Sequence, residues 1–130
     1  MDDQIKRPLK RNEEITQNYF NFLDQHLAAV IAGKTAELMQ LHQVAASLCI
    51  SHRHLTATVK HTTGQHPCYF YDRKILQQAQ KMLLETDLPV AEIARILTYD
   101  PSNFSKFFKK LYGETPGNFR KRHRKQIKLS

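Results

Sequence analysis

Apolar residues recur at three- and four-residue spacings along most of the chain, which is the period of a helix that buries one face. This pattern and the residues that flank it predict helices over residues 15–31, 41–48, 52–63, 68–86 and 101–112. No stretch alternates apolar and polar residues over the length of a strand. We therefore predict an all-α fold.

A repeat organises the middle of the chain. Residues 39–70 align without a gap with residues 88–119, at a constant offset of 49 positions. Identical pairs include Ala45 with Ala94, Lys60 with Lys109, Gly64 with Gly113, Pro67 with Pro116 and Phe70 with Phe119. Chance alignments rarely keep small, apolar, Gly and Pro positions in register together. We therefore expect one supersecondary unit to be used twice.

Each copy carries the signals of two helices joined by a tight turn. In the first copy, Ser51 is a good N-cap for the second helix, and Gly64 can end that helix in the left-handed conformation. In the second copy, Asp100 is the cap, Pro101 takes the first helical position and Gly113 is the stop. Two helices joined by a short turn, with a small Ala in the first, are typical of the helix-turn-helix motif.

The repeat predicts a division of the chain into five parts. These are a flexible N-terminal segment over residues 1–14, a first helix-turn-helix lobe over 15–66, a linking helix over 67–86, a second lobe over 87–120 and a basic C-terminal tail over 121–130. The linking helix should hold roughly 18 residues, or about 27 Å at 1.5 Å per residue. We expect it to fix one lobe relative to the other.

Positive charge is concentrated at the C-terminal end. The chain has 20 Lys and Arg against 12 Asp and Glu, and residues 120–130 carry six basic groups and no acid. Such a run suits a phosphate backbone or anionic lipid, and equally a solvated tail. No apolar run reaches the ~18 residues of a membrane span, and Asp2 and Asp3 stand where a signal peptide needs basic residues. We expect a cytoplasmic protein without a membrane partner.

Several segments in the second copy carry a family resemblance. Residues 91–94 (AEIA), 100–110 (DPSNFSKFFKK), 113–116 (GETP) and the pair Phe119 and Arg120 closely resemble the C-terminal signature of the AraC/XylS family of bacterial transcription regulators. The resemblance extends over about residues 18–120. It implies a two-lobed domain in which each lobe lays its second helix into a major groove of double-stranded DNA. It also implies that an activating member contacts RNA polymerase.

The chain departs from this family pattern at several points. Thr98 precedes Tyr99 where the family usually has Gly, and Ala57 stands where the family often has Arg. We expect the fold to survive and the first lobe to read fewer bases, and the departures leave the angle of the second recognition helix open. Residues 1–37 are too few for the N-terminal effector-binding domain of many members. We therefore expect a stand-alone DNA-binding form that works as a monomer on DNA.

The outward faces of the two recognition helices carry the side chains that would contact DNA. With Leu55 and Val59 turned inward, helix geometry places on the outward face of the first recognition helix His52, Arg53, Thr56, Ala57 and Lys60. The candidates for base contact are His52, Arg53 and Thr56 in the first copy and Ser102, Asn103 and Lys106 in the second. The candidates for phosphate contact are Lys60, Lys109, Lys110, Arg120, Lys121 and Arg122. The family pattern favours Arg53, Thr56 and Lys106 for the bases.

Other kinds of chemistry find little support in the sequence. Neither Cys49 nor Cys68 belongs to a pair with metal-ligand spacing, and no Ser/His/Asp set, Gly-rich phosphate loop or close carboxylate pair is present. We expect no metal, no cofactor and no enzymatic activity. Three functions stay open: a sequence-specific transcription regulator, a non-specific architectural DNA-binding protein, and an interaction module that docks on RNA polymerase or on a separate sensor protein.

Overall fold

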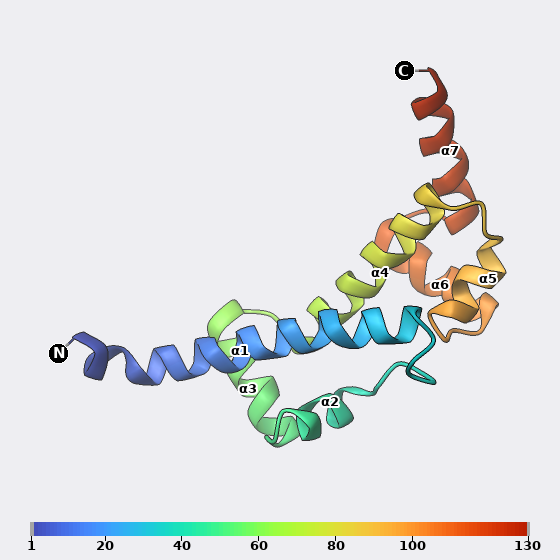
Figure 1. The fold of residues 1–130 in the computed structure, drawn as a ribbon. Helices are drawn as coiled ribbons and strands as arrows, with labels where there is room; N and C mark the ends of the chain where they lie inside the picture. The colour runs from blue at the N-terminus through green and yellow to red at the C-terminus, as the bar shows by residue number, and fades with distance from the viewer. Residues whose placement is uncertain (1, 130) are drawn as a thin grey trace. The chain divides into compact units, whose positions relative to one another are not determined.

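The computed structural model of the chain describes the backbone of residues 2–129 and the side chains of residues 11–124. This backbone forms helices and no strand, which confirms the predicted all-α class (Figure 1). The helices are α1 (Asp2–Ile31), α2 (Leu41–Ser47), α3 (His52–Thr63), α4 (Pro67–Glu85), α5 (Val90–Ile96), α6 (Pro101–Tyr112) and α7 (Pro116–Leu129). None of the described helices is both long and apolar enough to cross a membrane.

The chain forms two compact units, and each takes residues from two stretches of sequence. Unit 1 contains Met1–Ala28 and Met39–Asp72, whereas unit 2 contains Ala29–Leu38 and Arg73–Ser130. This division differs from the expected lobe boundaries at residues 66 and 86. The short segment Ala29–Leu38 comes from the expected first lobe but packs in unit 2, and the expected linking helix is divided between the two units.

The two helix-turn-helix elements repeat one another in their hydrogen bonds. Helices α2 and α5 begin and end 49 residues apart, and so do α3 and α6. Two bonds in each turn match. The bond from Cys49 N–H to the Ala46 carbonyl (3.0 Å) matches the bond from Thr98 N–H to the Arg95 carbonyl (2.9 Å). The bond from Ile50 N–H to the Ala45 carbonyl (3.1 Å) matches the bond from Tyr99 N–H to the Ala94 carbonyl (2.8 Å). The predicted duplication of one supersecondary unit is therefore confirmed.

The predicted caps fix the ends of both recognition helices. The Ser51 hydroxyl accepts a hydrogen bond from the His54 N–H at 3.0 Å, and the Asp100 carboxylate accepts from two N–H groups at the start of α6. These bonds satisfy donors that the first turn of a helix leaves unpaired. At the other ends, Gly64 (φ 81°) and Gly113 (φ 100°) adopt the left-handed conformation that stops each helix.

The core of unit 1 joins α1 to the first helix-turn-helix. Tyr19 and Leu23 of α1 are fully buried with Val44 of α2 and with the predicted inward residues Leu55 and Val59 of α3. The Tyr19 hydroxyl donates to the Pro67 carbonyl at 2.8 Å, which satisfies the polar end of that side chain at the start of α4. Helix α3 is thus held by its apolar side, and its opposite side is left to solvent.

The core of unit 2 is built around aromatic rings of α6 and α7. Phe104 and Phe108 are fully buried, as predicted, and the ring centroids of Phe108 and Phe119 lie 5.5 Å apart. Leu111, which we also expected to point inward, is only half-buried. It lies one turn after Phe108, in the last turn of α6 before Gly113.

Both ends of the chain are more helical than the sequence predicted. Helix α1 begins at Asp2, so the flexible segment expected over residues 1–14 is helical in its described backbone. Helix α7 runs from Pro116 to Leu129, so the basic tail expected over residues 121–130 also lies largely in a helix. Both segments are rich in charged residues, Lys, Arg and Glu in the first and Lys and Arg in the second, which favour helices but show no apolar stripe that periodicity could detect.

Candidate nucleic-acid interface

Helix α3 presents one polar face to solvent. His52, Arg53, Ala57 and Lys60 are exposed, and Thr56 on the same face is half-buried. Their spacing of one, three and four residues places them together on the side of α3 opposite the buried residues Leu55 and Val59. The geometry is that of a recognition helix whose donors are free to approach a groove, and the base contacts of these residues stay predictions.

Helix α6 presents the equivalent face in the second copy. Ser102, Asn103, Lys106, Lys109 and Lys110 are all exposed. They alternate with the buried phenylalanines, so the apolar and polar sides of α6 are well separated. Three of the five are lysines, which gives α6 more cationic donors than α3 carries at the corresponding positions. Their contacts with DNA likewise stay predictions.

The first residues of α6 already have a partner inside the protein. The Ser102 hydroxyl donates to the Asp100 carboxylate at 2.6 Å, and the backbone N–H groups of Ser102 and Asn103 donate to the same carboxylate. These bonds lower the pKa of Asp100, and the bond from the Ser102 hydroxyl has the largest effect. Ser102 therefore offers a base only its acceptor lone pairs, whereas the Asn103 amide and the Lys106 ammonium keep their donors.

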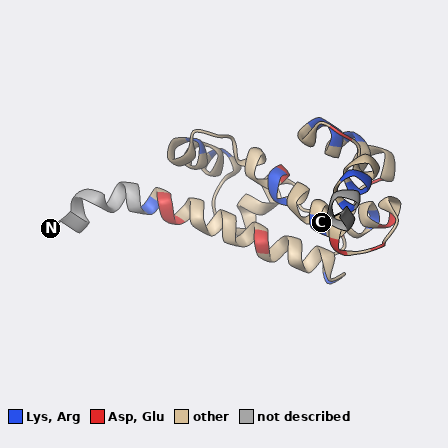
Figure 2. Cartoon of the chain, turned by 90° about the horizontal axis from the view of Figure 1, so that it is seen from above, with Lys and Arg blue, Asp and Glu red and all other residues tan. Residues whose placement is uncertain are grey.

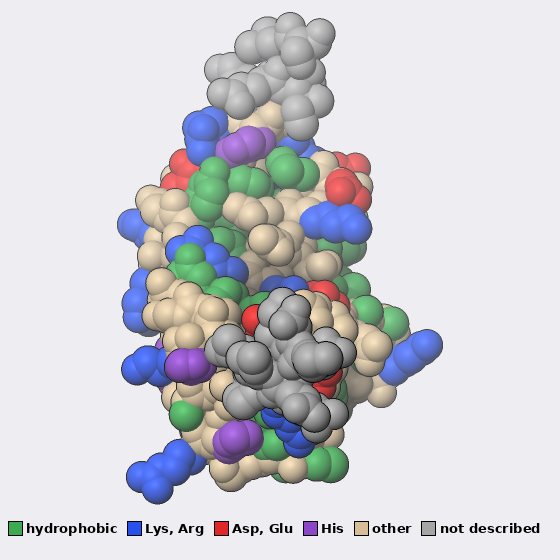
Figure 3. Space-filling model, turned by 90° about the vertical axis from the view of Figure 1, so that its left-hand side faces the viewer, with side chains coloured by type: hydrophobic (Ala, Val, Ile, Leu, Met, Phe, Trp, Pro, Cys, Tyr) green, Lys and Arg blue, Asp and Glu red, His purple; other side chains and the backbone are tan. Residues whose placement is uncertain are grey.

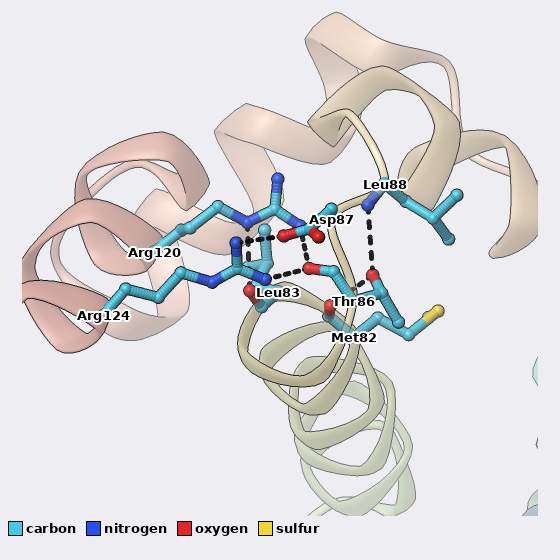
Figure 4. Close-up of polar contacts among 7 residues, drawn as sticks. All are labelled: Met82, Leu83, Thr86, Asp87, Leu88, Arg120 and Arg124. Carbon is cyan, nitrogen blue, oxygen red and sulfur yellow. Dashed lines mark hydrogen bonds and ion pairs between the residues drawn. The ribbon is translucent and has the colours of Figure 1, made fainter. Parts of the chain in front are cut away.

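Two arginines predicted to bind phosphate or to lie in the basic tail turn toward the end of α4 (Figure 4). Arg120 donates from Nε to the Leu83 carbonyl at 2.9 Å and from Nη2 to the Thr86 carbonyl at 3.2 Å. Arg124 donates to the Thr86 carbonyl and forms an ion pair with Asp87 at 2.7 Å. The last carbonyls of a helix have no partner within it, and cations near them are favourable. Both guanidinium groups therefore cap α4.

The burial and hydrogen bonds of the arginines at this end of the chain indicate that they stabilise the fold. Arg120 is half-buried, and burial followed by the neighbouring charge of Arg124 lowers its pKa. The Arg122 guanidinium lies at the surface and donates to both carboxylate oxygens of Glu114, with the shortest bond at 2.9 Å. The hydrogen bonds from Arg122 raise the pKa of that guanidinium. A phosphate contact by Arg120 or Arg122 would have to share or replace these bonds.

Among the remaining cations of the C-terminal segment, Lys121 is exposed to solvent. The predicted tail also includes Lys125 and Lys128, whose side chains lie outside the described residues. The sequence alone contained no sign that Arg120 and Arg124 cap α4, because the carbonyls that receive them lie 34 to 38 positions away. The only hint in the sequence was the presence of two carboxylates, Asp87 ahead of α5 and Glu114 ahead of α7, which could pair with arginines.

Charge is distributed unevenly over the elements of the chain. Acidic positions lie along α1 (Figure 2), where Glu13, Glu14 and Asp24 occur. On the face drawn in Figure 3, basic side chains and histidines alternate with hydrophobic and uncharged ones. In the part of the chain whose side chains are described, no group of three His, Cys, Asp or Glu could hold a metal, and Cys49 and Cys68 are free and exposed.

The chain is similar to transcription regulators over most of its length. Residues 44–122 match the family described as "Helix-turn-helix domain". An uncharacterized helix-turn-helix-type transcriptional regulator of Bacillus subtilis, YtdP, is 31% identical over 116 residues, which are 88% of this chain and 15% of that protein. This chain spans 37% of a second relative, the MmsAB operon regulatory protein of Pseudomonas aeruginosa, with 27% identity over 92% of this chain.

Solved structures agree with the family in sequence and in fold. The C-terminal domain of AraT, a response regulator from Geobacillus stearothermophilus, superposes with a TM-score of 0.71 and 27% identity, covering 82% of this chain and 84% of that one. The DNA-binding domain of AdpA, a global transcriptional factor solved with a target DNA, gives 0.65 and 25%, covering 81% and 98%. The chain therefore belongs to the helix-turn-helix family of DNA-binding transcription regulators, as a domain of the AraC/XylS type.

Proposed function

We propose that this chain is a sequence-specific transcription regulator that acts in the cytoplasm and reads DNA with α3 and α6, each in a major groove. The observation that carries the proposal is the duplication itself. The two recognition helices have the same length, a side-chain cap at the start (Ser51 and Asp100) and a left-handed glycine at the end. Each keeps an exposed polar face directly after its cap, where a recognition helix contacts bases.

The proposed roles follow from the donors that each helix exposes. Arg53 and Lys106 can donate to guanine O6 and N7, Asn103 can pair with adenine, and Thr56 can reach a thymine methyl group. His52 and Ser102 lie at the starts of the same faces and complete the set of proposed base contacts. Lysines further along each face would bind phosphates, which position the helix without reading sequence. These are Lys60, Lys109 and Lys110, with Lys121 from α7.

The two helices would read different sequences. Arg53 in the first copy corresponds to Ser102 in the second, and Ala57 corresponds to Lys106. A palindromic site reflects identical reading heads, so one chain with two different heads should select an asymmetric site. Successive major grooves lie about 34 Å apart. We propose that a single copy occupies both, and that an activating contact with RNA polymerase would use surfaces outside α3 and α6.

One observation favours a second function, that of an architectural protein without sequence preference. Ala57 has no donor at the position where the second copy has Lys106, so α3 has fewer groups that can read bases. If phosphate contacts dominated, binding would depend on salt but not on sequence. A third possibility is a module that docks on RNA polymerase or a separate sensor protein and does not need DNA.

Selection from a random DNA pool separates these functions. A reproducible two-part motif supports the regulator, and enrichment of DNA without a motif supports the architectural protein. No enrichment at all supports the docking module and contradicts both DNA-binding proposals. The same selection should be carried out with the purified full chain, since both units need residues from two stretches of sequence.

Two lysines of α6 test the assignment of roles within the site. We expect Lys106→Ala to relax preference at one base position and to weaken the preferred site by about 1–3 kcal/mol, and Lys109→Ala to weaken all sequences alike. Lys81→Ala, an exposed lysine on α4, is a control of equal charge change. Affinities for the selected site and for a scrambled site decide the matter. Equal losses on both sites for Lys106→Ala would contradict its role in base reading.

A further inference from the structure

Both helix-turn-helix turns contain a residue in a strained backbone conformation. Cys49 and Thr98 each have φ 62°, and they are the described non-glycine residues with positive φ. This left-handed region is uncommon for side chains with a Cβ and is least favourable for β-branched ones such as Thr. Such strain persists only where the surrounding structure holds the residue in place. The two turns differ in what holds them.

Thr98 has a partner far away in the sequence. Its Oγ1 accepts a hydrogen bond from the Leu38 N–H at 3.0 Å, across 60 positions, at a partly buried site. Both residues belong to unit 2. Leu38 is the last residue of the segment Ala29–Leu38, which contains the end of α1, a left-handed Gly33 and the bond from Lys34 N–H to the Ala29 carbonyl at 2.9 Å. The segment therefore has an ordered turn at one end and the Thr98 hydroxyl at the other.

Cys49 occupies the equivalent place without such a partner. It has the same φ and the same pair of backbone bonds, but its side chain is exposed and carries no hydroxyl. The strained backbone is thus compatible with the fold on its own, and the bond to Leu38 is an addition in the second copy. The duplication supplies an internal comparison, because one turn has the tether and the other lacks it.

The tether acts at a point that determines where α6 begins. Only Thr98 and Tyr99 lie between Leu97, the buried C-cap of α5, and Asp100, the N-cap of α6. The Tyr99 ring lies against Phe107 of α6, with centroids 5.1 Å apart. A change in the backbone at Thr98 is therefore passed to the first turn of α6 within two residues.

We propose that Thr98 is a positioning residue for DNA reading by α6, because its hydroxyl ties segment Ala29–Leu38 to the turn that sets the start of this helix. The role rests on the proposed reading of bases by Ser102, Asn103 and Lys106. Loss of the hydroxyl removes this added restraint from the turn of the second copy, so the first turn of α6 is held less firmly in place. Base discrimination in the part of the site read by α6 falls, and discrimination in the part read by α3 does not.

Four substitutions separate the hydroxyl from the shape of the side chain. Thr98→Val keeps the branch and removes the hydroxyl, whereas Thr98→Ser keeps the hydroxyl. Thr98→Gly removes the hydroxyl and the strain together, so it tests the tether in a chain whose turn is relaxed. Cys49→Val is the matched control, because it adds a branched side chain at the equivalent strained position where the structure shows no tether.

Two measurements read the result. Without DNA, hydrogen exchange at the Leu38 amide should become about two- to tenfold faster in Thr98→Val and Thr98→Gly, the range expected for one net hydrogen bond, and stay near the original rate in Thr98→Ser. In selection from a random DNA pool, the same two variants should lose about two- to tenfold of their discrimination at the bases read by α6. Cys49→Val should leave that half of the motif unchanged.

The possible outcomes distinguish this role from the proposed function. If the unsubstituted chain selects no motif, the proposed function fails, and this role for Thr98 fails with it. If it selects a two-part motif and Thr98→Val and Thr98→Gly keep both halves, the proposed function stands and the positioning role is overturned. An unchanged exchange rate at Leu38 in both variants overturns the tether itself.

Discussion

Replacing Arg120 by alanine tests whether this residue holds α4 or binds DNA. The guanidinium gives two hydrogen bonds to carbonyls at the C-terminal end of α4, at 2.9 Å and 3.2 Å, and is half-buried there. A net hydrogen bond from a charged donor contributes about 1.5–3 kcal/mol when buried, and less when water can replace the donor. Because both carbonyls are at a helix end near the surface, we expect Arg120→Ala to lower the free energy of unfolding by about 2–3 kcal/mol in total.

The size of the effect should depend on the two-point geometry and not on charge alone. Arg120→Lys keeps a cation near the helix end, which contributes about 0.3–1 kcal/mol, but it cannot donate to both carbonyls from one rigid plane. We therefore expect it to recover less than half of the loss. Lys121→Ala is a neighbouring control, because an exposed side chain without such bonds usually changes stability by less than about 0.5 kcal/mol.

Urea denaturation of the free protein measures these stabilities, and the salt dependence of DNA binding measures the phosphate contacts. We expect Arg120→Ala to leave the slope of log K against log salt unchanged and Lys121→Ala to reduce it by about 0.9, the share of a single phosphate. The reasoning is refuted if Arg120→Ala is as stable as Lys121→Ala and reduces the slope. That result would return Arg120 to the phosphate-binding role expected from sequence.

The remaining predictions concern the fold of unit 1 and the C-terminal segment. His26 is buried, its Nε2 accepts a hydrogen bond from the Met39 N–H at 2.9 Å, and burial lowers its pKa. We therefore expect the free energy of unfolding, measured by denaturation, to be constant above pH ~6.5 and to fall as the pH drops through the lowered pKa. His26→Leu should remove this dependence. Ser51→Ala should cost about 1 kcal/mol of unfolding free energy, and an unaltered denaturation midpoint would contradict the cap. Deleting residues 121–130 should reduce the salt slope by about 0.9 for each phosphate that the segment neutralises, once circular dichroism shows that the shortened chain still folds.

Local signals account for the parts of the fold that the sequence predicted well. Both recognition helices begin and end at the expected residues, because Ser51 and Asp100 act on N–H groups two or three positions away and the glycines act on their own backbone. The repeat also predicted matching turns. Such features need only a few neighbouring residues and are present in any short window of the sequence.

Contacts between distant residues account for the parts that the sequence did not predict. The bond from Leu38 to Thr98 spans 60 positions, and Arg120 reaches back 37 positions to Leu83. No spacing rule links such pairs, because their proximity arises only after the helices pack. The helical ends of the chain were missed for a different reason, since exposed charged helices show no apolar period. The residues that contact bases stay predictions, because they depend on the DNA.

Whether one chain reads DNA with two different helices is tested most directly by hydroxyl-radical footprinting of the complex on its selected DNA site. The footprint is recorded at saturating protein, and the mass of the same complex is determined. We expect one copy of the protein to protect two patches of an asymmetric site, with centres about one helical turn, or about 34 Å, apart. Protection of a single turn by one copy, or two copies bound to a palindromic site, would contradict reading by α3 and α6 of the same chain.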